Sequence, residues 1–143
     1  MPATIADPYN LRRFVDAQAN VFEQVVDELR EGRKRSHWMW FIFPQIAGLG
    51  SSSMAERYAI SGRDEAAAYM QHEVLGPRLR RCTELVNQVE NRTVKEIFGY
   101  PDNLKFRSSI TLFHSMESGQ NIFHAALEKY FAGKPDPATL ALV

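Results

Sequence analysis

Apolar residues recur through most of this chain at intervals of three and four positions, which is the period of an amphipathic α-helix. Acidic and basic residues fill many of the positions between them. Three of the apolar stripes are long: Val21, Phe22, Val25, Val26 and Leu29; Leu75, Leu79, Cys82, Val86 and Val89; and Ile122, Phe123, Ala126, Leu127, Tyr130 and Phe131. The pattern predicts helices over all three stretches.

Residues that begin and end helices stand at the edges of the stripes. Asp7-Pro8 and Asp136-Pro137 each place a carboxylate before a proline, which suits the first turn of a helix. Gly32 suits a helix end, because glycine adopts the left-handed backbone without penalty. Further helix signals are a capping box from Thr93 to Glu96 before Gly99, a segment from Ser61 to Asp64 that resembles a capping box, and a helix start at Pro101-Asp102.

We therefore expect an all-α fold, a single domain over residues 1–143 with roughly seven or eight short helices in an orthogonal array. A length of 143 residues suits one domain, and neither a repeat nor a low-complexity linker divides the chain.

The segment from Lys34 to Gln45, KRSHWMWFIFPQ, is the one stretch whose local structure the pattern leaves open. Residues 37–43 alternate as a short extended strand would, yet Ser36 and Pro44 would also begin and end a helix. The segment is apolar on all sides in either case, so we expect it to be a central part of the core.

Charge and length limit the partners. The chain has 17 Lys and Arg and 17 Asp and Glu residues, so no net field attracts nucleic acid or an anionic membrane. Its longest apolar run, residues 38–44, is far shorter than the ~20 residues of a membrane span, and its N-terminus lacks a signal-peptide pattern. We expect a cytoplasmic protein that binds neither nucleic acid nor membrane.

Metal and cofactor motifs are missing from the sequence. The single cysteine, Cys82, falls on an apolar stripe and suits a buried small side chain. The four histidines lack the spacing of a metal motif. Gly48 to Ser53 lacks the third glycine of a dinucleotide fingerprint and the lysine of a P-loop, so we expect a turn with a serine cap there. We expect neither a metal nor a cofactor.

Basic, aromatic and hydroxyl side chains nevertheless occur close together. Trp38 and Trp40 offer rings for stacking, and His37 and Glu65 are the candidates for general acid–base catalysis. Lys105 precedes a stripe of hydroxyls on one predicted helix, which either lines a polar pocket or bonds back to helix carbonyls. The full set of candidate ligand-binding residues is Lys34, Trp38, Trp40, Gln45, Arg57, Tyr58, His72, Arg78, Lys105, Ser108 and Ser109.

Two hypotheses follow from these residues. In the first, the protein binds or acts on a nucleotide-like anionic small molecule in a pocket walled by residues 34–45, and five or more candidates should converge on one cavity. In the second, it is a non-enzymatic interaction or structural protein, with that segment as core or dimer surface. The sequence decides neither whether the protein is an enzyme nor whether it is a monomer or a homodimer.

The string from Gly32 to Gln45, followed by Gly48-Leu49-Gly50, resembles a bacterial family of unknown function. The likeness extends from about Asp7 to Leu142 and includes Tyr58–Ile60, His72–Leu79 and Lys105–Phe113. It implies a small helical bacterial protein and brings no established activity. Members are often labelled calpastatin, but calpastatins are extended and disordered, unlike this composition, so we do not adopt that function.

A fainter likeness gives a third hypothesis. Asp16-Ala17-Gln18, an alanine-rich helix ending near Leu75-Gly76, Lys105 and a final element from Phe131 to Leu140 are loosely similar to another superfamily. That superfamily cleaves N-glycosidic bonds in ADP-ribose-type and riboflavin-precursor molecules. Its own glutamate-bearing aromatic motif is not reproduced in this chain.

Overall fold

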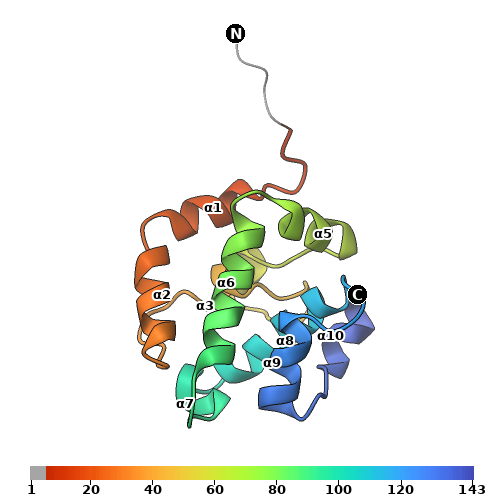
Figure 1. Ribbon diagram of the computed structural model, residues 1–143. Helices are drawn as coiled ribbons and strands as arrows, with labels where there is room; N and C mark the ends of the chain where they lie inside the picture. The colour runs from red at the N-terminus through yellow and green to blue at the C-terminus, as the bar shows by residue number, and fades with distance from the viewer. Residues whose placement is uncertain (1–5) are drawn as a thin grey trace.

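The computed structural model describes residues 6–143, and over that range the chain forms ten helices and one isolated parallel bridge between Ile46 and Ile60. The helices, most of them labelled in Figure 1, are α1 (Arg12–Ala19), α2 (Phe22–Arg30), α3 (Met39–Ile42), α4 (Ser53–Arg57), α5 (Arg63–Gln71), α6 (Leu75–Gln88), α7 (Val94–Phe98), α8 (Asp102–His114), α9 (Ile122–Phe131) and α10 (Pro137–Leu142). The prediction of an all-α fold is confirmed. The number of helices exceeds the expected seven or eight because α3 and α4 are only four and five residues long.

The helix ends follow from the capping residues. The Asp7 carboxylate accepts the backbone N–H groups of Leu11 and Arg12 at 2.8 and 3.1 Å, and these bonds lower its pKa. Thr93 and Glu96 form the predicted capping box at the start of α7. Ser61 differs from the prediction: its backbone N–H donates to Glu65 at 3.0 Å, and Gly62 precedes α5 without a side-chain cap.

Helix α6 runs through the middle of the molecule, with α2 on one side and α5 and α9 on the other (Figure 1). Its predicted apolar stripe is buried from Leu75 to Val89. Cys82 lies within this stripe, and burial raises the pKa of its thiol to about 12, so the thiol stays protonated. Helix α8 packs against α7, α9 and α10, and Ser108 in its middle bonds to Asp136 at the cap of α10.

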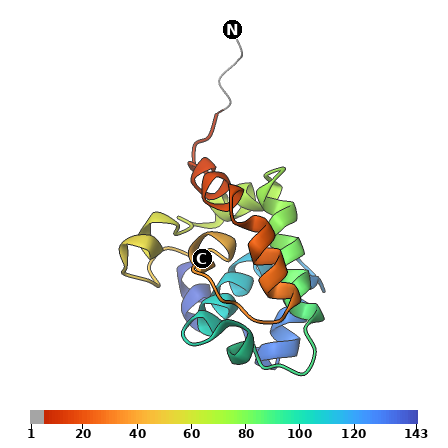
Figure 2. The same ribbon diagram turned by 90° about the vertical axis from the view of Figure 1, so that its left-hand side faces the viewer.

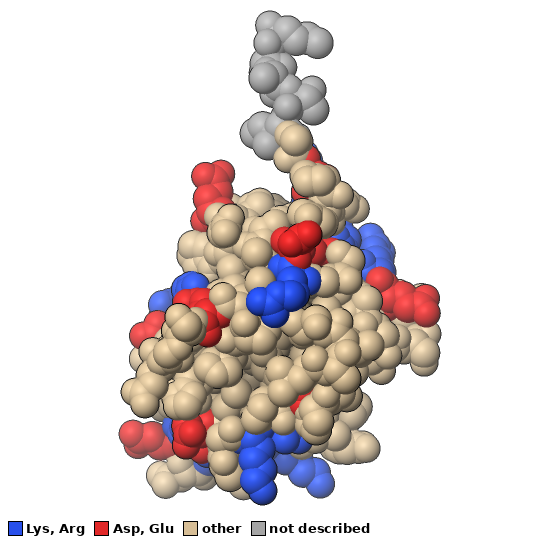
Figure 3. Space-filling view, turned by 90° about the vertical axis from the view of Figure 1, so that its right-hand side faces the viewer, with Lys and Arg blue, Asp and Glu red and all other residues tan. Residues whose placement is uncertain are grey.

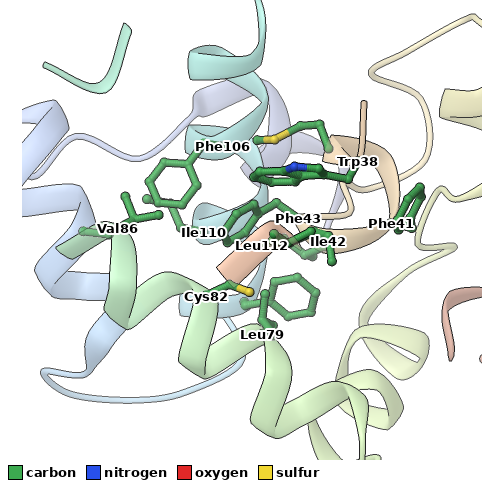
Figure 4. Packing of buried hydrophobic residues seen from close by; sticks show 14 of the residues in the cluster. Trp38, Phe41, Ile42, Phe43, Leu79, Cys82, Val86, Phe106, Ile110 and Leu112 are labelled. Carbon is green, nitrogen blue, oxygen red and sulfur yellow. The ribbon is translucent and has the colours of Figure 1, made fainter. Parts of the chain in front are cut away.

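The aromatic segment forms the centre of the core, as expected. Residues 39–42 are a single helical turn, so the open question of strand or helix is answered in favour of a helix, with Phe43 leaving it at φ −123° and ψ 72°. The rings of Phe43 and Phe106 meet edge to face at 5.0 Å, a favourable arrangement for aromatic pairs. Figure 4 shows Trp38, Ile42 and Phe43 among side chains from α6 and α8.

Residues 47–59, which we call the flap segment, project from the body of the molecule (the yellow loop of Figure 2). Two backbone hydrogen bonds close its base: Ala47 N–H donates to Ile60 O, and Ile60 N–H donates to Gln45 O, both at 2.8 Å. Helix α4, within the segment, has no buried residue. The segment is therefore fixed at its two ends, and between them Leu49 and Met54 contact the core from partly buried positions.

Among residues 6–143, no helix combines the length and hydropathy needed to cross a membrane.

Candidate functional site

A buried carboxylate fixes the first half of the aromatic segment. Glu28, on α2, is only 3% exposed. Its Oε1 accepts the backbone N–H groups of Arg35 and Ser36 at 2.7 and 3.0 Å and the indole N–H of Trp38 at 3.0 Å, while its Oε2 accepts the Ser36 hydroxyl at 2.7 Å. Burial alone would raise the pKa of Glu28, but these donors outweigh it and lower the pKa to about 2. Residues 35–38 are thereby held against α2.

Lys34 begins this fixed segment and reaches α8. Its backbone N–H donates to Ile97 O at 2.7 Å, and its side chain is 8% exposed. The ammonium lies 2.8 Å from Asp102 Oδ2 and 5.2 Å from the ring centre of Trp38. Because a buried ammonium is costly without a partner, the ion pair with Asp102 compensates the burial of Lys34.

Lys105 approaches the same carboxylate from one helical turn further along α8. Its ammonium lies 3.7 Å from Asp102 Oδ1 and 5.5 Å from the ring centre of Trp40, and its side chain is 28% exposed. Each tryptophan of the segment therefore faces one lysine, and Asp102 lies between the two lysines. Lys105 is the more exposed of the two lysines, and the Asp102 side chain is also partly exposed.

A hollow of about 410 Å³ lies between the flap segment and the start of α8, and we call it the α8 hollow. Its volume falls within the range of small-molecule sites, although it is open to solvent. Polar and apolar side chains both line it, chiefly Gln45, Leu49, Ser51, Ser52, Leu104, Lys105 and Ser108. Leu104 is also one of the four large hydrophobic residues that the described structure leaves exposed, and Tyr100 near it is 71% exposed.

The hydroxyl stripe of α8 bonds mostly within the protein. Ser108 Oγ donates to Leu104 O at 3.2 Å or to Asp136 Oδ2 at 2.7 Å, and Thr111 Oγ1 donates to Arg107 O at 2.7 Å. Burial tends to raise the pKa of Asp136, but the hydroxyls of Ser108 and Thr139 lower it overall. Thr111 therefore bonds back to a helix carbonyl, whereas Ser108 lines the α8 hollow and also joins α8 to the cap of α10.

Three of the predicted ligand-binding residues converge on the α8 hollow, fewer than the five expected of a large pocket: Gln45, Lys105 and Ser108. Lys34 and Trp40 do not line the hollow, but Lys34 pairs with Asp102 and the ring of Trp40 lies beside Lys105. Trp38 is 1% exposed and donates its N–H to Glu28, so its ring is enclosed by the core and offers no open face for stacking. Ser109 is fully buried, and its hydroxyl has no partner among the described residues.

The other candidates lie elsewhere on the molecule. Arg57 and Tyr58 line a separate hollow of about 390 Å³ beside α1. Arg78 lies over the ring of Phe22, 4.7 Å from its centre. His72 Nδ1 accepts the backbone N–H groups of Val74 and Leu75 at 3.1 and 3.2 Å, where α6 begins. These side chains do not form one site with Lys105.

The two candidate acid–base residues are also outside the α8 hollow. Glu65 is buried, with Oε2 at 2.8 Å from Arg13 and Oε1 accepting the N–H of Ser61 at 3.0 Å. Arg13 also donates to the carbonyls of Arg57 and Ala59, both at 2.9 Å, so this pair fastens α1 to the end of the flap segment. His37 is exposed just before α3. Catalysis by His37 or Glu65 stays a prediction.

Asp102 and Glu28 are the site residues that sequence reasoning missed. The sequence marks Asp102 as part of a helix start, although its place three residues before Lys105 is a spacing that brings side chains together on a helix. Glu28 looked like one more polar position between the apolar residues of α2. No sequence signal distinguishes it from Glu23 or Asp27.

Metal-binding geometry is not found in residues 6–143, where no three His, Cys, Asp or Glu side chains are grouped to hold an ion. His114 and His124 lie with their ring centres 5.6 Å apart, and His124 Nε2 is 3.7 Å from Glu128. The charged side chains on the face shown in Figure 3 occur in small groups of both signs.

Comparison with known proteins places the chain in a family. The model of the family described as "Protein of unknown function (DUF1810)" matches residues 8–143. The crystal structure of the conserved hypothetical protein Rv1873 from Mycobacterium tuberculosis is 58% identical, covers 96% of this chain and 98% of its own, and superposes with a TM-score of 0.94. No curated protein matches the chain. Neither description mentions calpastatin, and the family match covers all but the first seven residues, so the chain belongs to the DUF1810 family of proteins of unknown function.

Proposed function

We propose that this protein binds a small anionic molecule in the α8 hollow. The observation that carries the proposal is Lys105, a partly exposed cation that lines a hollow of about 410 Å³ together with Gln45 and the hydroxyl-bearing Ser51 and Ser52. A lysine ammonium beside amide and hydroxyl groups suits a phosphate or carboxylate.

The apolar part of the hollow suggests the rest of the ligand. Leu49 and Leu104 line the same hollow and would contact an uncharged ring or chain. A nucleotide-like molecule has both parts, a charged group and a flat ring, and its size agrees with this volume. The site is smaller than the one expected from the sequence, because Lys105 and Gln45 belong to it while Trp38, Arg78 and His72 do not.

Thermal unfolding with a panel of ligands tests the proposal. Phosphate, AMP, ADP and ADP-ribose should raise the unfolding midpoint, while adenosine and ribose, which lack the charge, should not. Lys105→Met should remove most of the shift, and Lys95→Met, which changes an exposed lysine on α7, should retain it. The absence of a shift with every anion at millimolar concentration, or an equal shift in the two variants, would contradict the proposal.

The same mixtures distinguish a binding protein from a hydrolase. Chromatography of ADP-ribose-type compounds after incubation would reveal release of a base by cleavage of an N-glycosidic bond. Turnover that Lys105→Met abolishes would identify the α8 hollow as catalytic, whereas unchanged compound with a clear thermal shift would support binding alone.

A further inference from the structure

We infer that the ion pair between the buried Lys34 ammonium and the partly exposed Asp102 carboxylate positions Lys105 and sets the net charge of the α8 hollow at one positive charge. This inference rests on the proposed function, since it assigns how the hollow selects an anion. It concerns two residues that do not line the hollow and therefore act on a ligand only through Lys105.

Lys34 is held too firmly to serve a ligand itself. Its own backbone is bonded to Ile97, and the next two residues along the chain are bonded to Glu28. Its ammonium is almost fully enclosed and touches Asp102 Oδ2 at 2.8 Å. The charge of Lys34 is therefore directed to Asp102 and compensates it.

Lys105 is held more loosely than Lys34. Its ammonium is 3.7 Å from Asp102 Oδ1, beyond a direct hydrogen bond, and the face of Trp40 lies on another side of it. Because Lys34 already compensates the carboxylate, Asp102 guides Lys105 without forming a tight pair with it. Two lysines and one aspartate leave one positive charge, and Lys105 is the lysine that can present it.

Other charges near the hollow balance one another. Asp136 accepts the hydroxyl of Ser108, and Arg107, whose positive charge helps to lower the pKa of Asp136, lies on the same side. Arg107 is itself fixed by hydrogen bonds to Lys134 O and Pro135 O, both at 3.0 Å. The hollow should thus favour a ligand with one or two negative charges in a compact group over an uncharged one.

A charge series tests the inference in the protein without ligand. Acetylation of Lys105 by a water-soluble N-hydroxysuccinimide ester is followed by mass spectrometry in four proteins: wild type, Lys34→Met, Asp102→Asn and the double variant. In Lys34→Met, Asp102 is left to pair with Lys105 alone, so acetylation of Lys105 should slow by about threefold or more. The double variant should return to the wild-type rate, because both the carboxylate and its partner are gone.

Binding of ADP-ribose and of phosphate to the same four proteins by calorimetry provides the second measurement. Affinity should fall about tenfold in Lys34→Met, recover in the double variant and exceed the wild-type value in Asp102→Asn, following net charges of zero, one and two. Lys95→Met is the control for a lost surface charge. A purely structural role predicts a different order, in which affinity and the unfolding midpoint fall together in all three variants.

The outcomes separate the inference from the proposed function. Unchanged acetylation of Lys105 in Lys34→Met overturns the inference whether or not any ligand binds. If acetylation of Lys105 changes as expected but neither probe binds the wild type, the positioning pair stands and the result counts against the proposed function. If Lys34→Met does not fold, the test uses wild type, Asp102→Asn and the double variant. Equal rates of Lys105 acetylation in these three proteins would also overturn the inference.

Discussion

At the scale of single residues, the side chain that organises the aromatic segment is a carboxylate that nothing in the sequence marks. Glu28 lies on the inner face of α2 and accepts two backbone N–H groups, an indole N–H and a hydroxyl. Hydrogen bonds to a charged acceptor are among the stronger ones in proteins, and a buried carboxylate with all its donors in place is stable in the charged form. Removing its charge should therefore weaken the hydrogen bonds that hold residues 35–38.

Glu28→Gln should destabilise the protein by about 2–4 kcal/mol at neutral pH, because one carboxylate oxygen becomes an amide that faces the Ser36 hydroxyl and Gln24. The measurement is urea denaturation followed by far-ultraviolet circular dichroism. Glu23→Gln, on the exposed side of the same helix, is the matched control and should change the free energy of unfolding by less than about 0.5 kcal/mol. Equal effects of the two changes would show that the donors around Glu28 contribute nothing special.

The contribution of Glu28 should also appear in the pH dependence of the free energy of unfolding. The pKa of Glu28 is about 2 in the folded protein, against 4.5 for an ordinary glutamate side chain, so its contribution is present above pH 4.5 and is lost as pH falls toward 2. Between pH 6 and pH 3, wild type should lose about 2 kcal/mol more than Glu28→Gln. Unfolding free energies of both proteins at pH 6, 4 and 3 check this, and parallel curves would contradict it.

At the scale of elements, the flap segment differs from every other part of the described chain. Helix α4 buries no residue, and Gly50 passes so close to Ala55 that an added Cβ would lie 2.7 Å from the Ala55 Cβ. Local stability depends on buried apolar contacts, and between its fixed ends the flap segment contributes the partly buried side chains of Leu49 and Met54 but no fully buried one. It is also one wall of the α8 hollow, so its mobility and ligand binding should be coupled.

Hydrogen exchange should detect this coupling. Amides of α4 should exchange much faster than those of α6 and α8 in the free protein, because the opening of α4 exposes only partly buried side chains. A saturating anion that binds the α8 hollow should slow exchange in α4 and leave α2 unaffected. Fast and unchanged exchange in α4 at saturation would show that the flap segment takes no part in binding.

The elements that the sequence predicted correctly are those with either a long apolar stripe or a strong cap. Helix α6 shows the first signal and α7 the second, through Thr93 and Glu96. Helices α3 and α4 are shorter than two turns, too short for a 3.6-residue period to be visible. Helix α3 is apolar throughout, and α4 has two adjacent apolar residues, Met54 and Ala55, which are too few to form a stripe, so neither pattern identifies a helix.

At the scale of the whole molecule, the α8 hollow depends on parts of the chain that are distant in sequence. The aromatic segment, the flap segment and the start of α8 meet there, and the meeting is fixed by long-range bonds such as those of Lys34 with Ile97 and Asp102. Periodicity describes each part separately. It could therefore nominate Gln45, Lys105 and Ser108, but it could not show that Arg78 and His72 lie on other surfaces or that Trp38 is enclosed.

The two tryptophans should consequently differ in how far substitution affects stability and how far it affects binding. Trp38→Phe removes volume and the indole N–H from a fully packed site and leaves Glu28 short of a donor, so it should cost about 2–4 kcal/mol of stability. Trp40→Leu removes the ring beside Lys105 from a half-buried position and should cost about 1–2 kcal/mol, with a larger loss of ADP-ribose affinity than Trp38→Phe.

Denaturation and calorimetry on both variants distinguish the two roles. A core residue affects binding only through stability, whereas a residue beside Lys105 affects binding in a protein that is still folded. Greater loss of affinity in Trp38→Phe, at temperatures where both variants are folded, would mean that the ligand is recognised at the enclosed end of the aromatic segment. The hollow beside Lys105 would then be a structural feature of the surface, and the hydrogen bonds of Glu28 would have to be reinterpreted as part of the binding site.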